Sequence, residues 1–122
     1  MKEKTTKKFN DKEKKFFLTF PIPYVNGLLH LGHALTFTRA EFIALYKKLK
    51  GYDVLFPQGF HITGSPIIAM VYRLKNNDRK IVEDLKMQGV KDYEIENFKN
   101  PDYWVKYFVP KAEEAIKKIS YI

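Results

Sequence analysis

The chain has no cysteine among its 122 residues, which excludes disulfides and every cysteine-based metal site. No apolar run approaches the roughly 20 residues that a membrane-spanning helix needs, since the longest candidate is only residues 66–71. The beginning of the chain has no apolar signal core, and Glu3, Asp11 and Glu13 do not suit an acid-poor transit peptide. We therefore expect a soluble, cytoplasmic protein with no membrane partner.

Several common catalytic motifs are also absent. The chain contains neither Gly-x-Gly-x-x-Gly nor Gly-x-x-x-x-Gly-Lys, so dinucleotide binding and P-loop hydrolysis are disfavoured. No Glu stands between the paired histidines His30 and His33, which removes the zinc metalloprotease pattern. A zinc site would need His61 as a third ligand, so we expect no metal site in the protein.

Positive charge is in excess, with 22 Lys and Arg against 14 Asp and Glu, a formal net charge of +8 and a sequence pI of about 9.5. This balance favours an anionic partner. Residues 1–15 hold seven of the lysines and three acids, and we expect them to form a flexible, solvated tail rather than a specific RNA contact. With 45% hydrophobic residues, the whole chain has enough apolar material for a core, and residues 16–122 are expected to fold as one unit.

The first half of the chain predicts a strand, a helix and a second strand. Residues 16–20 form a continuous apolar run, typical of a strand that is buried on both faces. Residues 31–50 have helical periodicity and end at Gly51, a favoured residue after a helix C-terminus, and residues 52–56 predict the next strand. The apolar stripe predicted for this helix comprises Phe42, Leu45, Tyr46 and Leu49, with Arg39, Glu41 and three lysines facing solvent.

The second half predicts helices only. Ser65 and Pro66 resemble an N-cap followed by a proline in the first turn, and the helix should run to about Lys75 with Ile67, Val71 and Leu74 buried. Asp78 is expected to cap another helix that ends before Gly89; Asn100-Pro101 repeats the capping signal, and a last helix is expected from about Pro110. A parallel sheet of two strands is rarely stable alone. The pattern therefore predicts an α/β fold: a βαβ unit followed by helices, forming the incomplete N-terminal part of a Rossmann-like parallel-sheet nucleotide-binding domain.

All three histidines lie in two short segments, residues 21–33 and 56–66, which also contain four of the six prolines. His30 and His33 stand at a helix start, three positions apart and therefore on the same side. The unpaired N–H groups of such a start attract phosphate, and Asn26-Gly27 and Gly32 would let a ligand approach the backbone. An alternative is that His30 and His33 are two ordinary polar residues, that His61 is a loop histidine bonded to backbone, and that Tyr24 packs rather than lines a pocket.

With these residues in hand, the chain resembles the class I aminoacyl-tRNA synthetases, and within them the leucyl-tRNA synthetases of archaeal and eukaryotic cytosolic type. His-Leu-Gly-His at 30–33 matches the class signature His-Ile-Gly-His, preceded by Pro-Tyr-x-Asn-Gly at 23–27. Residues 55–67 are similar to the family's Phe-Pro-x-Gly-Phe-His-x-Thr-Gly-x-Pro-Ile. Gln-Gly-Val at 88–90, Glu-Ile at 94–95 and the Asn100–Phe108 segment resemble the leucyl enzymes too, so the likeness covers about residues 16–119.

The resemblance implies ATP-dependent activation of leucine to leucyl-adenylate and its transfer to tRNA-Leu. It implies that His30 and His33 are catalytic and bind ATP together with Asn26, Gly27 and Gly32. It further implies that Tyr24 and His61 bind leucine. ATP would be a substrate that arrives with Mg²⁺, and no tightly bound cofactor is expected.

The chain also departs from the family pattern. Ile22, Leu28, Gln58 and Ser65 stand where the cytosolic enzymes usually carry other residues, which bears on the fit of the substrate. The editing insertion, the Lys-Met-Ser-Lys-Ser half of the nucleotide fold and the anticodon-binding helices are not in this sequence. We therefore expect an N-terminal fragment that is inactive alone, whose partners can include a second chain carrying the rest of the enzyme. Two alternatives remain: a nucleotidylyltransferase with the same His-x-Gly-His chemistry, and a non-catalytic paralogue that binds RNA or a protein partner.

Overall fold

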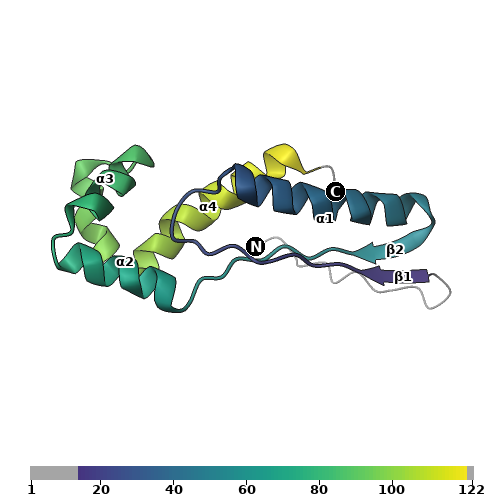
Figure 1. Cartoon of the computed structure of the whole chain (residues 1–122), viewed down its shortest axis with the longest axis horizontal. Helices are drawn as coiled ribbons and strands as arrows, with labels where there is room; N and C mark the ends of the chain where they lie inside the picture. The colour runs from purple at the N-terminus through teal and green to yellow at the C-terminus, as the bar shows by residue number, and fades with distance from the viewer. Residues whose placement is uncertain (1–13, 121–122) are drawn as a thin grey trace, which may run out of the picture.

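Two parallel strands and the helix that connects them form one end of an elongated molecule, and shorter helices form the other end (Figure 1). The computed structural model describes residues 14–120. In order along the chain, its elements are β1 (Lys14–Phe17), α1 (Leu31–Leu49), β2 (Tyr52–Leu55), α2 (Ser65–Lys75), α3 (Arg79–Met87), the 3₁₀ helix η1 (Asp92–Lys99) and α4 (Pro101–Ile119). Lys14 pairs with Tyr52 and Phe17 with Leu55, so the predicted βαβ unit is confirmed.

The first strand begins two residues earlier than expected and ends earlier, at Phe17. Lys14 and Lys15, which we assigned to the basic tail, therefore belong to β1, while the rest of that tail, residues 1–13, lies outside the described residues. The prediction that this strand is buried on both faces is wrong, because Phe17 is 62% exposed. Its physical reason is that α1 covers one face of the described two-stranded sheet and no other described helix covers the opposite face (Figure 1).

Helix α1 has the predicted bounds, with His30 as N-cap and Gly51, at φ +79°, just after its end. Its buried side is not the predicted one. Phe37, Ala40, Glu41 and Ala44 are buried, whereas Phe42 is 69% and Leu49 87% exposed. Small alanines allow the helix to approach β2 and α4 closely, and that geometry turns the larger apolar residues outward.

The main core lies in the helical end of the molecule. Its centre is Phe98 of η1, fully buried, which has edge contacts with the rings of Trp104 and Tyr107. The indole N–H of Trp104 donates to the carbonyl oxygen of Phe98 at 2.7 Å, so the one polar atom of this ring is satisfied. The stripe predicted for α2 is confirmed, and it joins this core; the buried residues are Val25, Ile67, Val71, Leu74, Ile81, Leu85, Val90, Phe98, Trp104 and Phe108.

The sequence predicts a capping residue at three helix starts, and two of these residues cap their helices. Asp78 caps α3 by accepting from the N–H of Lys80 at 3.0 Å, and Asn100 caps α4 by accepting from Asp102 at 3.0 Å. Ser65 is not a cap: Gly64, at φ +99°, occupies that position and Ser65 is the first residue of α2. A glycine serves there because an L side chain is strained at such a backbone angle.

A separate last helix starting near Pro110 is not present. Helix α4 is continuous from Pro101 to Ile119, and Pro110 lies inside it. A proline there lacks one N–H and crowds the preceding turn. Trp104 and Phe108 before it and Ala112 after it are all buried on one stripe, so packing holds the two halves in one helix.

Candidate functional site

The paired histidines hydrogen-bond reciprocally across the first turn of α1. The backbone N–H of Gly32 donates to Nδ1 of His30 at 3.1 Å, and the backbone N–H of His30 donates to Nδ1 of His33 at 3.2 Å. The two rings lie 4.0 Å apart between centroids. The expectation that both rings share one side of the helix start is therefore confirmed.

Two backbone N–H groups at this helix start already have partners within the chain. The N–H of Gly32 is used by the His30 ring, and the N–H of His33 donates to the His30 carbonyl at 2.9 Å. A Cβ on Gly32 would lie 2.9 Å from Cε1 of His30, so Gly32 gives room first to the histidine ring itself. The groups that remain for a ligand are thus the ring nitrogens rather than these two amides.

The same bonds define which nitrogen of each neutral ring carries the proton. A neutral imidazole has one donor and one acceptor nitrogen, and in both rings Nδ1 is the acceptor. Nε2 of His30 and Nε2 of His33 therefore each carry an N–H. The pair presents two donors, which suits the oxygen atoms of an anion such as a phosphate.

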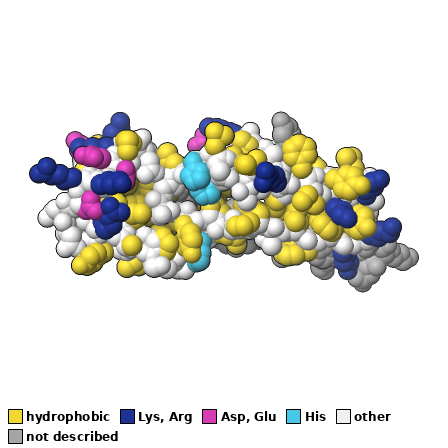
Figure 2. Space-filling model, in the orientation of Figure 1, with side chains coloured by type: hydrophobic (Ala, Val, Ile, Leu, Met, Phe, Trp, Pro, Cys, Tyr) yellow, Lys and Arg dark blue, Asp and Glu magenta, His cyan; other side chains and the backbone are white. Residues whose placement is uncertain are grey.

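Burial lowers the pKa of His33 below its ordinary value, and the neighbouring His30 lowers it further. His33 consequently remains neutral around pH 7 until an anion approaches, and a bound anion would favour its charged form. Figure 2 shows histidine side chains near the middle of the visible face, between the helical end and the strand end of the molecule.

Both histidines line an apolar pocket of about 240 Å³. Phe20 and Pro23 contribute from the segment after β1, while Ile116 and Ile119 contribute from α4. Apolar residues thus stand beside the His33 ring, which is half-buried, while His30 is exposed. The pocket therefore combines two histidine side chains with an otherwise apolar lining.

Tyr24 and His61 meet a short distance away. Their rings stack at 4.3 Å between centroids with 16° between the planes, and their backbones form an isolated parallel bridge. The N–H of His61 donates to the Pro23 carbonyl at 2.8 Å, and the N–H of Val25 donates to the His61 carbonyl at 3.4 Å. The structure thus brings together the two residues that we predicted to bind an amino acid, although neither lines the pocket of His30 and His33.

A one-residue slip of register separates this bridge from the sheet. Phe17 pairs with Leu55, but Tyr24 pairs with His61, so residues 18–23 hold one residue more than the facing segment 56–60. Without the slip, Tyr24 would lie opposite Ile62. Because side chains alternate between faces along an extended chain, this extra residue decides which rings face each other.

Asn26 and Gly27 do not line the histidine pocket. Asn26 lines a separate pocket of about 170 Å³ together with Gln88 and Trp104. A Cβ on Gly27 would lie 2.8 Å from Oε1 of Gln88, and the same oxygen accepts from the N–H of Leu28 at 2.7 Å. Sequence reasoning noted Gln88 only as part of a family pattern and missed this contact; the ATP-binding role of Asn26 and Gly27 stays a prediction.

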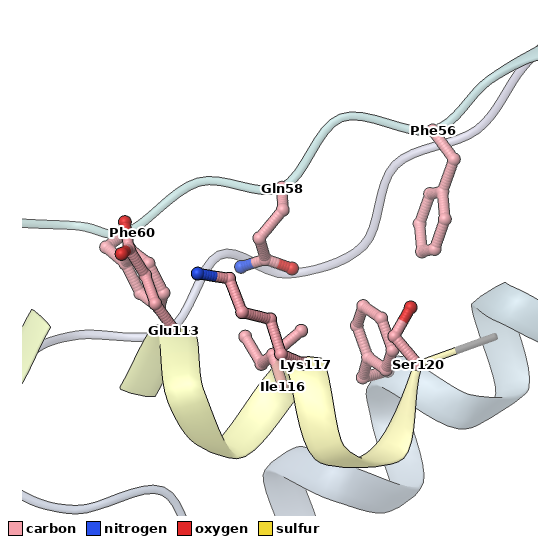
Figure 3. Close-up of a pocket in the computed structure, with 8 residues that line it drawn as sticks. Phe56, Gln58, Phe60, Glu113, Ile116, Lys117 and Ser120 are labelled. Atoms are coloured by element: carbon pink, nitrogen blue, oxygen red, sulfur yellow. The ribbon is translucent and has the colours of Figure 1, made fainter. Parts of the chain in front are cut away.

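The largest of the described pockets, about 490 Å³, contains none of the predicted site residues. It lies between the segment after β2 and helix α4, with Phe56 and Phe60 on one side and Ile116 on the other (Figure 3). The side chains of Gln58 and Lys117 point toward one another across it in Figure 3. Phe37 and Ile116 also line the histidine pocket, so the two pockets are neighbours.

Within residues 14–120, no group of three or more His, Asp or Glu side chains lies close enough to hold a metal ion. Among the described helices, none has the length and apolar character needed to cross a membrane.

Comparison with known proteins gives the family of this chain. The family model of the class I tRNA synthetases (I, L, M and V) matches residues 2–120, and the chain belongs to this family. Its relatives are named leucine–tRNA ligase: that of Nanoarchaeum equitans is 54% identical over 109 residues, which cover 89% of this chain and 11% of the relative. That of Aeropyrum pernix is 46% identical over 95 residues, covering 78% and 10%, and that of Archaeoglobus fulgidus 44% over 113 residues, covering 92% and 12%.

The chain thus spans about a ninth of the length of these curated relatives. The resemblance drawn from the sequence motifs is confirmed at the level of the family and of the relatives' names. The structure adds the architecture: the described residues form a mixed α/β domain with two parallel strands and five helices.

Proposed function

We propose that this chain carries the histidine half of the ATP and leucine site of a leucine–tRNA ligase, within a Rossmann-like nucleotide-binding domain. The observation that supports it is the His30 and His33 pair, two residues that line one pocket and accept backbone N–H groups at Nδ1, together with the Tyr24 and His61 stack. The relatives' names supply the leucine and the tRNA. In an open α/β sheet, ligands bind beyond the carboxyl ends of the strands, where all four side chains stand.

In the proposed reaction, the carboxylate of leucine attacks the α-phosphorus of ATP and pyrophosphate leaves. Negative charge accumulates on phosphate oxygens as the bond to pyrophosphate breaks, and the two histidine N–H groups would stabilise it without forming a covalent bond. His33 is neutral beforehand, so it gains most if the phosphates arrive as an anion and raise its pKa. Mg²⁺ would travel on the ATP phosphates, because the described residues offer no carboxylate cluster for it.

Tyr24 and His61 would form the wall against which the amino acid rests. Two stacked rings give a flat apolar surface, and the imidazole adds a polar edge for the ammonium or carboxylate group of leucine. An apolar pocket separates side chains that differ by one methylene by only about 1–3 kcal/mol, so this wall alone gives limited discrimination. The cytoplasmic location and a complementing second chain belong to the same proposal.

Calorimetry with ATP tests the proposal directly. The chain is expected to bind ATP, and His33→Ala is expected to weaken that binding about tenfold, since a hydrogen bond to a charged group contributes about 1.5 kcal/mol or more. His61→Ala, outside the histidine pocket, is the matched control for ATP. Equal ATP binding by wild type and His33→Ala would contradict the proposal.

A second measurement separates the alternatives. We expect the chain alone to show no leucine-dependent exchange of pyrophosphate into ATP. Leucine that tightens ATP binding would support the ligase assignment over a nucleotidylyltransferase, while binding of RNA without any ATP binding would favour a non-catalytic paralogue.

A further inference from the structure

Gln88 connects two parts of the molecule that are 60 residues apart in sequence. It is the C-cap residue of α3 and is half-buried. Its Oε1 accepts from the backbone N–H of Leu28 at 2.7 Å, and its Nε2 donates to the carbonyl of Asp84 at 3.2 Å. Helix α3 therefore orients the Gln88 amide, and the amide in turn binds the loop that contains Leu28.

The loop that Gln88 contacts leads directly into the histidine pair. Val25, at the start of this loop, is buried in the core, and His30, at its end, is the N-cap of α1. Between these two fixed points, the Leu28 N–H donates a long-range bond to the side chain of Gln88. The position of the His30 ring depends on where residues 26–29 place its backbone.

Gly27 supports the same reading. A Cβ there would lie 2.8 Å from Oε1 of Gln88, closer than side chains tolerate, and 3.5 Å from its Cδ. Gly27 does not have a positive φ, so its backbone could accept an alanine. An alanine at Gly27 would therefore make the Gln88 amide shift from the position in which it accepts from Leu28.

We propose that Gln88 is a positioning residue for the paired histidines, whose amide oxygen holds residues 26–29 so that His30 and His33 face their pocket together. This inference rests on the proposed function for its effect on ATP. The contact itself is independent of that function. Gln88 acts through Leu28 and does not line the histidine pocket.

The test uses the whole chain and two substitutions. Gln88→Met keeps the size of the side chain and removes the acceptor, while Gln88→Glu keeps an acceptor for Leu28. In Gln88→Met, the Leu28 amide should exchange with solvent about fivefold faster, the factor of one typical net hydrogen bond. The NMR signals of the His30 and His33 rings should shift, and ATP should bind more weakly; Gln88→Glu should restore the protection of Leu28.

Gln58→Met is the matched control, because the Gln58 amide donates to its neighbour Gly59 and lines the 490 Å³ pocket, to which residues 26–29 do not contribute. It should leave the exchange of the Leu28 amide and the signals of both histidine rings unchanged. A lower melting temperature in Gln88→Met with unchanged Leu28 exchange and unchanged ring signals would overturn the proposal, since that is what a merely structural role predicts. If Gln88→Met speeds the exchange of the Leu28 amide but leaves the ATP affinity unaltered, the proposal is overturned as well.

Two other results of these experiments also bear on Gln88. If wild type binds no ATP, the proposed function fails, while Leu28 exchange and the ring signals still decide whether Gln88 positions the pair. If Gln88→Met does not fold, Gly27→Ala produces the displacement from the other side. In the otherwise wild-type chain, Gly27→Ala should speed the exchange of the Leu28 amide and shift the signals of both histidine rings, and unchanged Leu28 exchange would contradict the contact.

Discussion

The hydroxyl of Ser120 donates to Oε1 of Glu41 at 2.7 Å, which ties the end of α4 to the middle of α1. Glu41 is only 2% exposed, although the sequence predicts a solvent-facing residue. The pair lies beside the wall shared by the two pockets, since Ser120 lines one of them and the preceding turn of α4 lines both.

Ser120→Ala is expected to lower the free energy of unfolding by about 1–2 kcal/mol, because a buried carboxylate loses a hydrogen-bond donor. Urea denaturation followed by circular dichroism measures this. Ser65→Ala is the matched control, since Ser65 is exposed and makes no capping bond. An equal decrease in the free energy of unfolding in the two variants would show that the Ser120 bond to Glu41 does not stabilise the fold.

The titration of His33 should make stability depend on pH. Its pKa is lowered in the folded chain, so the unfolded chain takes up a proton first as the pH falls. The His33 contribution to stability is therefore complete above the ordinary value of about 6.5, decreases below it, and levels off below the folded pKa. Denaturation at pH 7.5 and 5.5 should show less pH dependence in His33→Asn than in His61→Asn; the reverse order would contradict the assignment.

Capping and ligand binding by His30 can be separated. Asparagine is a good N-cap, so His30→Asn should unfold within a few tenths of a kcal/mol of wild type, whereas His30→Ala should lose about 1 kcal/mol. Both variants lack the Nε2–H donor and should bind ATP more weakly. If His30→Asn binds ATP as wild type does, the ring contributes only to the helix start.

Replacing Pro110 by alanine should stabilise α4. The alanine restores the missing N–H inside the helix and relieves crowding, and Pro110 is exposed, so no core contact is lost. We expect a gain of about 1–2 kcal/mol, measured by thermal unfolding. Pro101→Ala is the control, because a proline in the first turn has no lost bond to regain. A loss of stability in Pro110→Ala would show that the proline shapes the helix.

Local signals predicted much of this fold. Asp78 and Asn100 cap the helices they were expected to cap, and Ile67, Val71 and Leu74 are buried, because capping and helical periodicity depend on a few neighbouring residues. The pairing of His30 with His33 is of the same kind. Each of these features is set within one or two turns of chain.

The features that were missed depend on distant parts of the chain. Alanines, rather than Phe42 and Leu49, face inward on α1 because β2 and α4 approach it closely, and no local pattern reveals how near a partner helix will come. The Gln88 contact with Leu28 joins residues 60 positions apart. The 3₁₀ helix η1 was missed as well, since Phe98 is placed by the rings around it rather than by a regular repeat.

The extra residue in the segment between β1 and Tyr24 makes chain length a determinant of the site. Deleting one residue from the facing segment 56–60 would bring Ile62 rather than His61 opposite Tyr24, even if every remaining side chain were unchanged. Conservative replacements within this segment would leave the stacked rings in place. The number of peptide units there, more than their identity, defines where the two aromatic faces meet.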